Sequence, residues 1–474
     1  MTGCIIEKLK ELGYETLSED HFRRIDVWKQ WYSGCVPSFH NYKIYNGIHH
    51  VACHKVSASL AKKVCEDWAD RLFTDETDIT LEGVPEQKFF DLFCEKTDFW
   101  QKMNGFLELT FALGSGACVL RMNGVSLDRN QEIARGGDLC MDFVSADGIF
   151  PLSWENGTIR ECAFTTECSR GDADYCYLQL HLQGGDGNYV IQNHLYRKEN
   201  ETLTEMDLNS APGFESVAEE FRTGSEKALF VIFRPNVSNN LDMGDPLGIS
   251  VFANGIDQLI ACDNVFDSLN SEFLLGRKRI MVKPEGVKNV DGTPFMDLNE
   301  TAFYALPEGS GNETIIQEMQ ATLRVQEHLT GMELTTNMLS VKTGFSPGHW
   351  KLDQQSLHLH TATEVISTNS AEYRTLKKHQ ILLEKELIEL VRVILKVGSE
   401  IYGLGLSEDV EISIDFDDSI VKDTNTEFER DLKMLDAGIL APEEFRAKWM
   451  NEDAETAEKA IAEIKKGVKD KDDR

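Results

Sequence analysis

Hydrophobic positions recur at helical spacing over most of the first 110 residues. Apolar side chains lie three or four positions apart in Ile5–Leu12 and in Ile25–Trp31, which predicts two amphipathic helices. The run Ile48–Leu72 has an apolar residue at every fourth position of its second half and predicts a longer helix. Phe89–Leu113 predicts another, which ends at a Gly-Ser-Gly break. This part of the chain is therefore expected to be mainly helical.

The apolar period changes to two from Ala117 onward. Six strand-like runs are separated by Gly, Asn and Asp: ACVLRM, CMDFVSA, IRECAFTTEC, YCYLQLHLQG, NYVIQNHLYRK and KALFVIFRP. Leu127–Pro235 is therefore expected to form an antiparallel β-rich block. A helical block followed by such a block predicts an α+β fold.

Helical spacing returns in Gly248–Leu275, in about Val325–Val341 and in Thr361–Tyr402. Short strands punctuated by Gly and Pro separate the first two of these runs. The irregular segment FSPGHWKLDQQSLHLH precedes the third, whose first residues, TATE, fit a capping box. At about 1.5 Å per residue the third helix would span roughly 63 Å, so it is expected to cross a whole subunit.

The C-terminal part reads as one strand followed by short helices. Val410–Phe416 alternates as a strand does, and Thr424–Ala437 is helical up to Gly438. Proline at the first helical position predicts a helix at Pro442–Met450, and a charged helix follows from Glu452 to about Lys466.

The charge balance is strongly acidic, with 80 Asp and Glu against 48 Lys and Arg, a net charge of −32. Such a chain repels phosphate backbones, which disfavours sequence-specific DNA binding. The 11 cysteines form no CxxC motif and are expected to be reduced thiols in an intracellular protein. No apolar run reaches the about 18–20 residues of a membrane span, and the N-terminal residues lack a signal-peptide core.

Several residue clusters resemble catalytic or metal sites. His50 and His54 stand four apart, as zinc ligands do on a helix, and His49 and Cys53 lie beside them. The glutamate of that zinc motif is absent, so a polar helix face is the preferred interpretation. The Gly-Ser-Gly break at 114–116 lacks the lysine of a P-loop and reads as a helix-to-strand connection. We predict no catalytic residue, metal ligand or cofactor, and keep as an alternative a cytosolic hydrolase or metal enzyme using the Cys/His-rich N-terminal half.

Several stretches, in this order, resemble one protein family. They are DVWKQWYSG (26–34), GISVFANGIDQLIACDNVFDSLNSEFLLGRKRI (248–280), KTGFSPG (342–348), TATEVISTNSAEYRTLKKHQ (361–380) and DAGILAPEEFR (436–446). The chain resembles the portal protein, or head–tail connector, of tailed bacteriophages, of the type common in phages of Gram-positive bacteria. The resemblance covers nearly the whole chain and is strongest over 244–404.

The resemblance implies a non-enzymatic dodecameric ring at one vertex of the phage head. The ring would conduct double-stranded DNA during packaging and ejection, without sequence specificity. Its expected partners are the terminase motor, the head–tail adaptor, and the major capsid protein with its scaffold. It would be assembled in the host cytoplasm and contact no membrane.

The resemblance also implies a division of the chain into regions. These are a wing (1–235), a first stem helix (244–276), a clip (277–324), a second stem helix (325–343), a tunnel loop (344–360), a long wing helix with a wing strand (361–422) and a helical crown (423–474).

The tunnel loop is expected to face DNA in the channel. Its expected DNA-facing residues are Ser346, His349, Trp350, Lys351, Asp353, His358 and His360, and Trp350 is expected to pack on a neighbouring subunit. A metal bound across the ring by the three histidines is disfavoured, because a flexible loop is a poor coordination cage. Four bases follow the first stem helix: Arg277, Lys278, Arg279 and Lys283. They would complement the helix dipole, form salt bridges between subunits or contact DNA.

Overall fold

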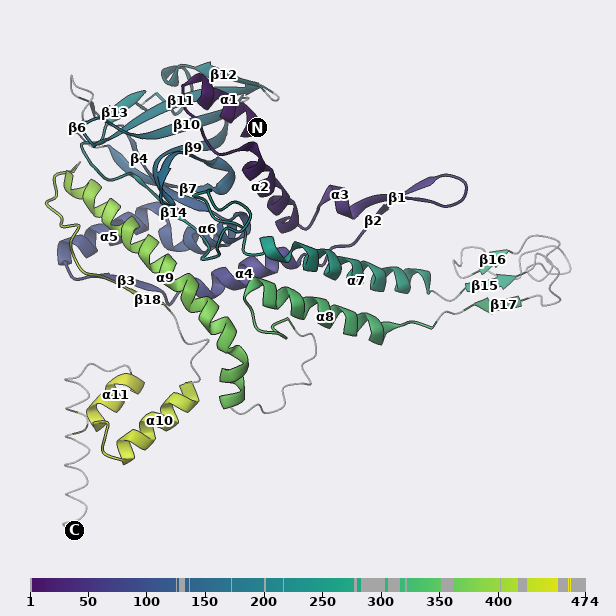
Figure 1. Cartoon of the computed structure of the whole chain (residues 1–474). Coiled ribbons are helices and arrows are strands. Elements are labelled where there is room, and N and C mark those ends of the chain that lie inside the picture. Colours follow the sequence, from purple (N-terminus) through teal and green to yellow (C-terminus); the bar gives the residue numbers. More distant parts are fainter. Residues whose placement is uncertain are drawn as a thin grey trace, which may run out of the picture.

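The computed structural model describes residues 2–450 except 125, 128–132, 136, 172, 200–201, 216, 277–278, 283–302, 306–315, 320–321, 351–361, 401 and 417–423, together with Lys459 and Ile461. Figure 1 shows a body of sheets and helices, from which α7 (Ile256–Leu275) and α8 (Val325–Thr343) project as an antiparallel pair. The expected α+β class is confirmed.

Six helices form the N-terminal part of the body. They are α1 (Thr2–Glu11), α2 (Glu19–Tyr32), the short α3 (Pro37–His40), α4 (Leu60–Leu72), α5 (Val84–Thr97) and α6 (Phe99–Leu113). The predicted helix Phe89–Leu113 is in fact two helices. Asp98 between them takes a left-handed conformation with φ of 53°, which breaks the helical path and lets α5 and α6 pack against each other.

The prediction of one helix over Ile48–Leu72 is wrong in its first part. Strands β1 (Asn41–Tyr45) and β2 (His50–His54) form a hairpin, which we call the hairpin arm, and only α4 is helical. The Asn46-Gly47 turn closes the arm, with Gly47 at a φ of 96°. Asn-Gly between alternating residues is a strong hairpin signal, and the helical period of the following residues obscured it.

The predicted antiparallel β block is confirmed and divides into two main sheets. The larger has the order β12–β11–β10–β9–β8, with β13 also paired to β11, and the smaller has the order β14–β4–β7. Their strands are β4 (Gly116–Asn123), β7 (Asp138–Ser145), β8 (Ile149–Glu155), β9 (Thr158–Arg170), β10 (Ala173–Gln183), β11 (Tyr189–Glu199), β12 (Thr202–Met206), β13 (Glu220–Arg222) and β14 (Phe230–Phe233). A small separate ladder joins β5 (Ser126–Leu127) to β6 (Ile133–Arg135).

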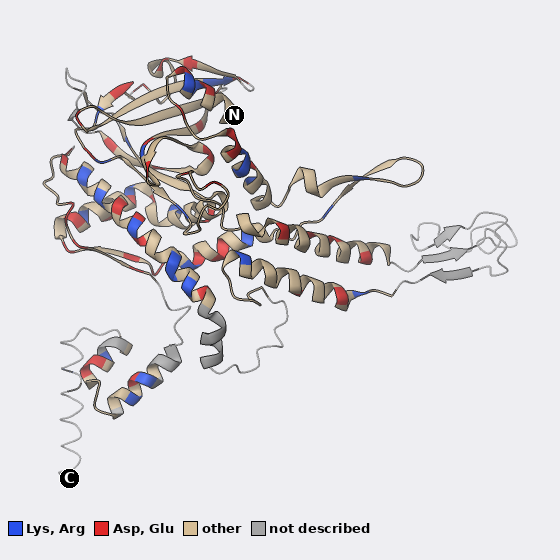
Figure 2. Ribbon diagram, viewed as in Figure 1, with Lys and Arg blue, Asp and Glu red and all other residues tan. Residues whose placement is uncertain are grey.

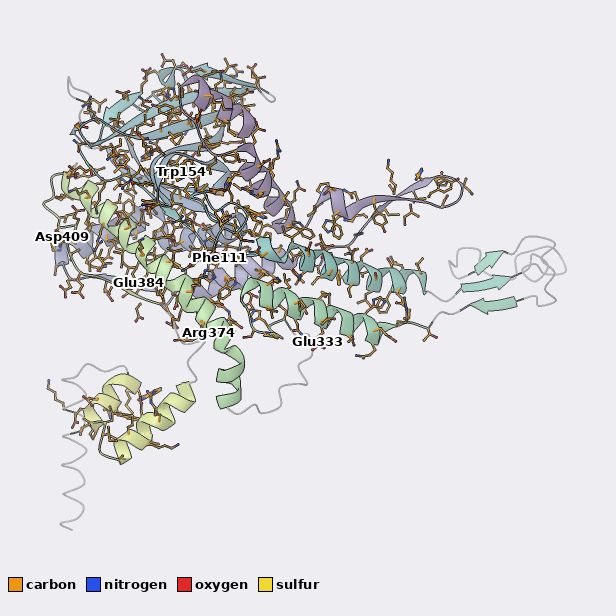
Figure 3. All side chains as sticks on the ribbon, in the orientation of Figure 1. Phe111, Trp154, Glu333, Arg374, Glu384 and Asp409 are labelled. Atoms are coloured by element: carbon orange, nitrogen blue, oxygen red, sulfur yellow. The ribbon has the colours of Figure 1, made fainter. Side chains whose placement is uncertain are left out.

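Helix α9 (Ala362–Glu400) crosses the body and packs against β14, α5 and α4. Its 39 residues correspond to about 58 Å, in line with the expectation of a traversing helix. Arg374 and Glu384 mark its path in Figure 3. Leu387, Leu390 and Ile394 from α9 are fully buried in the main core, which α4, α6 and the two sheets also enter.

The C-terminal strand returns to the N-terminal part of the chain. β18 (Ile412–Asp415) pairs antiparallel with β3 (Asp78–Leu81), more than 300 residues earlier. The predicted tail helices are present as α10 (Thr424–Asp436) and α11 (Pro442–Met450). The predicted helix from Glu452 to about Lys466 falls mostly outside the described residues.

The projecting pair begins later than predicted, because residues 248–255 are not part of α7. Gly248 and Gly114 touch so closely that a Cβ on Gly248 would lie 2.3 Å from the Gly114 carbonyl oxygen. The Val251 N–H donates to the Phe111 carbonyl at 2.9 Å. This buried segment ties α7 to the end of α6, and the Gly-Ser-Gly break is the predicted helix-to-strand connection. At the far end of the pair, β15 (Arg279–Val282) lies between β16 (Phe303–Ala305) and β17 (Ile316–Met319).

Candidate functional site

The chain leaves α8 through a turn that only glycine fits well. Gly344 follows the last residue of α8 with φ of 89°, in the left-handed region. A Cβ at this position would lie 2.6 Å from Cγ2 of Thr375 on α9 and 3.3 Å from Cζ2 of Trp68 on α4. The turn therefore seats the next residues between these two helices.

An aromatic column holds these residues. The Phe345 ring stacks on Trp68 at 4.4 Å between centroids and on His349 at 4.3 Å, and Trp350 meets Phe345 edge-on at 5.2 Å. The Trp68 indole N–H also donates to the Thr343 carbonyl at 3.0 Å. Phe345 is 2% exposed, so this part of the loop belongs to the hydrophobic core.

Asp67 on α4 accepts hydrogen bonds from residues of the loop. Its Oδ2 accepts the indole N–H of Trp350 at 2.7 Å and lies 3.0 Å from Nε2 of His349, and Lys63 Nζ lies 2.8 Å from Oδ1. Burial alone would raise the pKa of this carboxyl. The hydrogen bonds from His349, Lys63 and Trp350 outweigh burial and lower the pKa to about 2. Asp67 is therefore a carboxylate at neutral pH.

Glu372 on α9 holds the other side of the loop. Its Oε2 accepts the Ser346 N–H at 2.8 Å, and its Oε1 lies 2.6 Å from Arg71 Nη1 and 3.6 Å from His349 Nδ1. The His349 ring thus lies between two carboxylates from different helices. We call Asp67, Trp68, Arg71, Phe345, Ser346, His349, Trp350 and Glu372 the loop anchor.

The loop anchor corrects part of the sequence prediction. Ser346 is buried, and His349 and Trp350 are bound to α4 of their own chain. Trp350 is only partly buried by its own chain, so its expected contact with a neighbouring subunit stays a prediction. These three residues hold the base of the loop instead of projecting from it, because two carboxylates and an aromatic column offer them intramolecular partners.

The other predicted site residues fall largely outside the described part of the chain. Lys351, Asp353, His358 and His360 lie in 351–361, and the expected cap at Thr361 is in the same segment. Among the four bases after α7, Arg277, Lys278 and Lys283 are also outside, and Arg279 is described only as the first residue of β15.

The predicted histidine cluster does not share a helix face. His50 and His54 are the end residues of β2, where four positions correspond to about 14 Å. Ligands of one zinc ion each lie about 2 Å from the metal, so this pair is too widely spaced for a common ion. Among the described residues, no group of three His, Cys, Asp or Glu side chains is placed to hold a metal.

The cysteines give no support to the enzyme alternative. None of the eleven is part of a disulfide. Burial raises the pKa of Cys65, Cys118 and Cys162 well above the ordinary thiol value, so these thiols stay protonated. A protonated, buried thiol is a poor nucleophile.

The segment that follows β14 is hydrogen-bonded to α9 through Asn236. The Asn236 N–H donates to Nδ1 of His379 at 3.0 Å, and its side-chain amide donates to the Lys378 carbonyl at 2.6 Å. Burial lowers the pKa of His379 to about 3, and burial raises that of Glu386. His379 is therefore uncharged at neutral pH, as its position in the core requires.

Sequence reasoning missed the two carboxylates of the loop anchor. Asp67 and Glu372 each lie within a helical run and read as ordinary polar positions. No local signal marks them, because the loop residues that they bind are 282 and 26 positions away respectively.

The sequence of the chain matches the model of a phage protein family. The model of the family described as "Phage portal protein, SPP1 Gp6-like" matches residues 15–470, nearly the whole chain. The chain therefore belongs to this family of phage portal proteins, and the predicted family is confirmed. No curated protein matches it.

Membership of this family defines a structural role. The chain is a portal protein, the head–tail connector component of a phage virion that takes part in DNA packaging. The family is structural, and nothing found supports the hydrolase alternative. No described helix is both long and apolar enough to span a membrane.

Proposed function

We propose that twelve copies of this chain close into a ring that conducts double-stranded DNA into and out of the phage head. The observation that carries the proposal is the family match together with the loop anchor. The anchor holds residues 344–350, which follow the projecting helix α8, against α4 and the crossing helix α9. A loop so placed, repeated around a ring, suits a constriction of the channel.

The regions of the chain are proposed accordingly. Residues 1–235 with β18 form the wing, α7 and α8 the stem, 277–324 the clip, and 423–474 the crown. We restrict the proposed tunnel loop to residues 351–360, because residues 344–350 are held by the loop anchor. Within it Lys351, Asp353, His358 and His360 are the proposed DNA-facing residues.

The charge of the chain supports movement of DNA more than retention. A net charge of −32 per chain, multiplied around a ring, disfavours static phosphate contacts. Transport needs similar free energies at successive positions of the DNA, which weak contacts provide.

The proposed partners are those that a packaging ring must meet: the terminase motor and then the head–tail adaptor at the clip, and the capsid protein with its scaffold around the wing. Assembly in the host cytoplasm is part of the same proposal. For Arg277, Lys278, Arg279 and Lys283, we propose that they complement the dipole of α7, whose last turn contains no base.

Two measurements test this function. Electron microscopy and native mass measurement of the purified protein should give rings of twelve copies with an open centre, and compact monomers or dimers would contradict the proposal. Deleting residues 352–360 should leave rings intact and abolish DNA packaging in a complementation assay. A variant with residues 352–360 replaced by Gly and Ser keeps the length of the loop. Comparing it with the deletion shows whether packaging depends on the length of the loop or on its side chains. Normal head filling by the deletion variant would refute the tunnel-loop assignment.

A further inference from the structure

The hairpin arm has one apolar face and one polar face. Directly opposite residues of a hairpin point to the same side, and alternate residues to opposite sides. The pairs Tyr42↔Cys53 and Ile44↔Val51 therefore form one face, which is apolar. The pairs Lys43↔Ala52 and Tyr45↔His50 form the other face, together with the end pair Asn41↔His54.

Toward the tip of the arm the apolar face is exposed, whereas at its base Lys55 lies over the Tyr42 ring, with Nζ 5.6 Å from the centroid. Ile44 is 49% exposed, and Tyr42 and Val51 are also exposed. Figure 3 shows the side chains of the arm standing clear of the body. An isolated two-stranded hairpin is at best marginally stable in water, and three or more strands or a packing partner are usually needed. The arm therefore has the properties of a segment that is completed by another molecule.

The base of the arm is firmly held. Asp263 on α7 accepts from Nε2 of His40 and from the Ser57 hydroxyl, both at 3.0 Å, and from the Ala58 N–H at 2.7 Å. His40 and Asp263 are both buried. Asp267, one turn along α7, accepts the Val56 N–H at 3.0 Å. Because its base is fixed, the arm pays little conformational entropy when it binds a partner.

The charge of the arm identifies the chemistry of that partner. Residues 41–55 include two lysines and three histidines but no acid, in a chain with 80 acids. Figure 2 shows Lys or Arg but no Asp or Glu on the arm. Helix α7 has four acids, Asp257, Asp263, Asp267 and Glu272, and no Lys or Arg. An acidic partner such as a second copy of this chain is therefore electrostatically favoured.

The surface that could receive the arm lies on α8, the other helix of the projecting pair. At about 100° per residue, Asp263 and Asp267 lie on the side of α7 opposite to Val265 and Glu272. The first two hold the base of the arm, and the last two face α8, through Gly331 and His328 respectively. Arm and α8 thus lie on opposite sides of α7, as Figure 1 also shows.

Helix α8 has an uncovered apolar stripe. Leu334, Met338 and Val341 are spaced as i, i+4 and i+7, so they share one face, and all three are exposed. Glu327, two turns before Leu334, adds an acid to the same face. Two different patches on one subunit are what a head-to-tail contact in a closed ring requires.

We propose that the hairpin arm packs through Tyr42, Ile44, Val51 and Cys53 on the Leu334–Met338–Val341 stripe of α8 in the next copy of the chain. The contact buries both apolar surfaces and brings the arm, which carries no acid, next to the acidic helix pair of the neighbour. This inference rests on the proposed ring, and adds the surface that joins one subunit to the next.

The first test is a pair of arm variants. Ile44→Ser with Val51→Ser removes the apolar face, and Tyr45→Ser removes a large side chain from the opposite face as the matched control. The double variant should need about tenfold or more protein to assemble rings, measured by analytical ultracentrifugation, since apolar burial drives such contacts. Tyr45→Ser should assemble like the wild type. An unchanged melting temperature of the unassembled protein shows that the body stays folded.

The second test is a cross-link between copies. Ile44→Cys and Leu334→Cys proteins are mixed, assembled and oxidised, with wild type in place of each as the background for the native cysteines. The expected product is a covalent dimer that joins position 44 of one copy to 334 of another, identified by peptide mass spectrometry. Self-linked Ile44→Cys dimers would overturn the proposal in favour of an arm-to-arm contact.

The outcomes separate this inference from the proposed function. Wild-type protein that forms no ring contradicts the proposed function itself. Wild-type rings together with normal assembly of the Ile44→Ser, Val51→Ser protein, or with no 44–334 product, overturn the arm contact alone.

Discussion

The indole N–H of Trp350 donates to Oδ2 of Asp67 at 2.7 Å, across 283 positions of the chain. The same carboxylate oxygen lies 3.0 Å from Nε2 of His349, so two consecutive loop residues bind one side chain of α4. These two contacts hold residues 349 and 350 against the body of the chain. It also makes the base of the loop sensitive to a single carboxylate.

Trp350→Phe tests this hydrogen bond, and a matched Trp→Phe control accounts for the smaller ring. The variant keeps an aromatic ring against Phe345 and leaves one acceptor site of Asp67 unfilled, which should lower the free energy of unfolding by about 1.5–3 kcal/mol, as for hydrogen bonds to charged groups. Urea unfolding of the unassembled protein measures this change in the free energy of unfolding. Trp154→Phe, at an exposed strand position, is the control and should change stability by less than about 0.5 kcal/mol. Equal effects of both variants would mean that the Asp67 contact adds no stability.

Asp67 should contribute a defined part of the pH dependence of stability. Its pKa falls from the ordinary 3.8 to about 2 in the folded chain, so its contribution is present above about pH 4. The contribution is lost as pH falls through about 2, because protonation removes the charge that His349, Lys63 and Trp350 bind. The stability difference between wild type and Asp67→Asn should therefore be constant from pH 7 to 5 and shrink below pH 4. A difference that grows on acidification would contradict the assignment.

Gly344→Ala should be costly for two reasons. Alanine at a φ of 89° is strained by about 1–2 kcal/mol, and its Cβ would collide with Thr375, which adds about 1–3 kcal/mol of overpacking. Gly405→Ala has a similar φ of 65° with open space around it, so it measures the strain alone. Thermal unfolding of both variants should place Gly344→Ala clearly below Gly405→Ala, and a similar loss in both would exclude the collision.

Asp263→Ala should loosen the hairpin arm without unfolding the body. The variant leaves buried His40 without its carboxylate and removes the acceptor of Ser57 and Ala58, at a cost of about 1–3 kcal/mol. Hydrogen exchange should become faster over residues 36–58 and stay unchanged in the β10 and β11 strands. Asp257→Ala, at an exposed position of the same helix, is the control. No change in exchange at the arm would show that Asp263 does not hold its base.

Neutralising the bases after α7 tests their proposed role. Arg277→Gln with Lys278→Gln should lower stability by no more than about 1 kcal/mol, the usual size of a helix-dipole interaction, and less at high salt. DNA packaging should stay normal. Packaging that fails while rings remain stable would instead assign these bases to DNA or to the motor.

Much of the architecture could be predicted from local patterns. The change of apolar period near Ala117, the crossing helix and the strand near Val410 follow from side chains that alternate at 3.6 or 2 positions. The hairpin arm is not predicted from the sequence, although Asn46-Gly47 signals a hairpin, because the apolar spacing of α4 continues backwards over these residues. The start of α7 was placed too early because the contact of Gly248 with Gly114 has no local signature.

Composition, apolar period and recognisable stretches suffice for the fold class, the order of the elements, the acidic charge and the family. The contacts of Ser346, His349 and Trp350 with Asp67 and Glu372 follow only from the folded chain. Those contacts join residues far apart in the chain, and a carboxylate on a helix face reads the same whether it meets water or a loop. The uncovered face of the arm was likewise visible only once the strands were paired, because their register decides which side chains stand together.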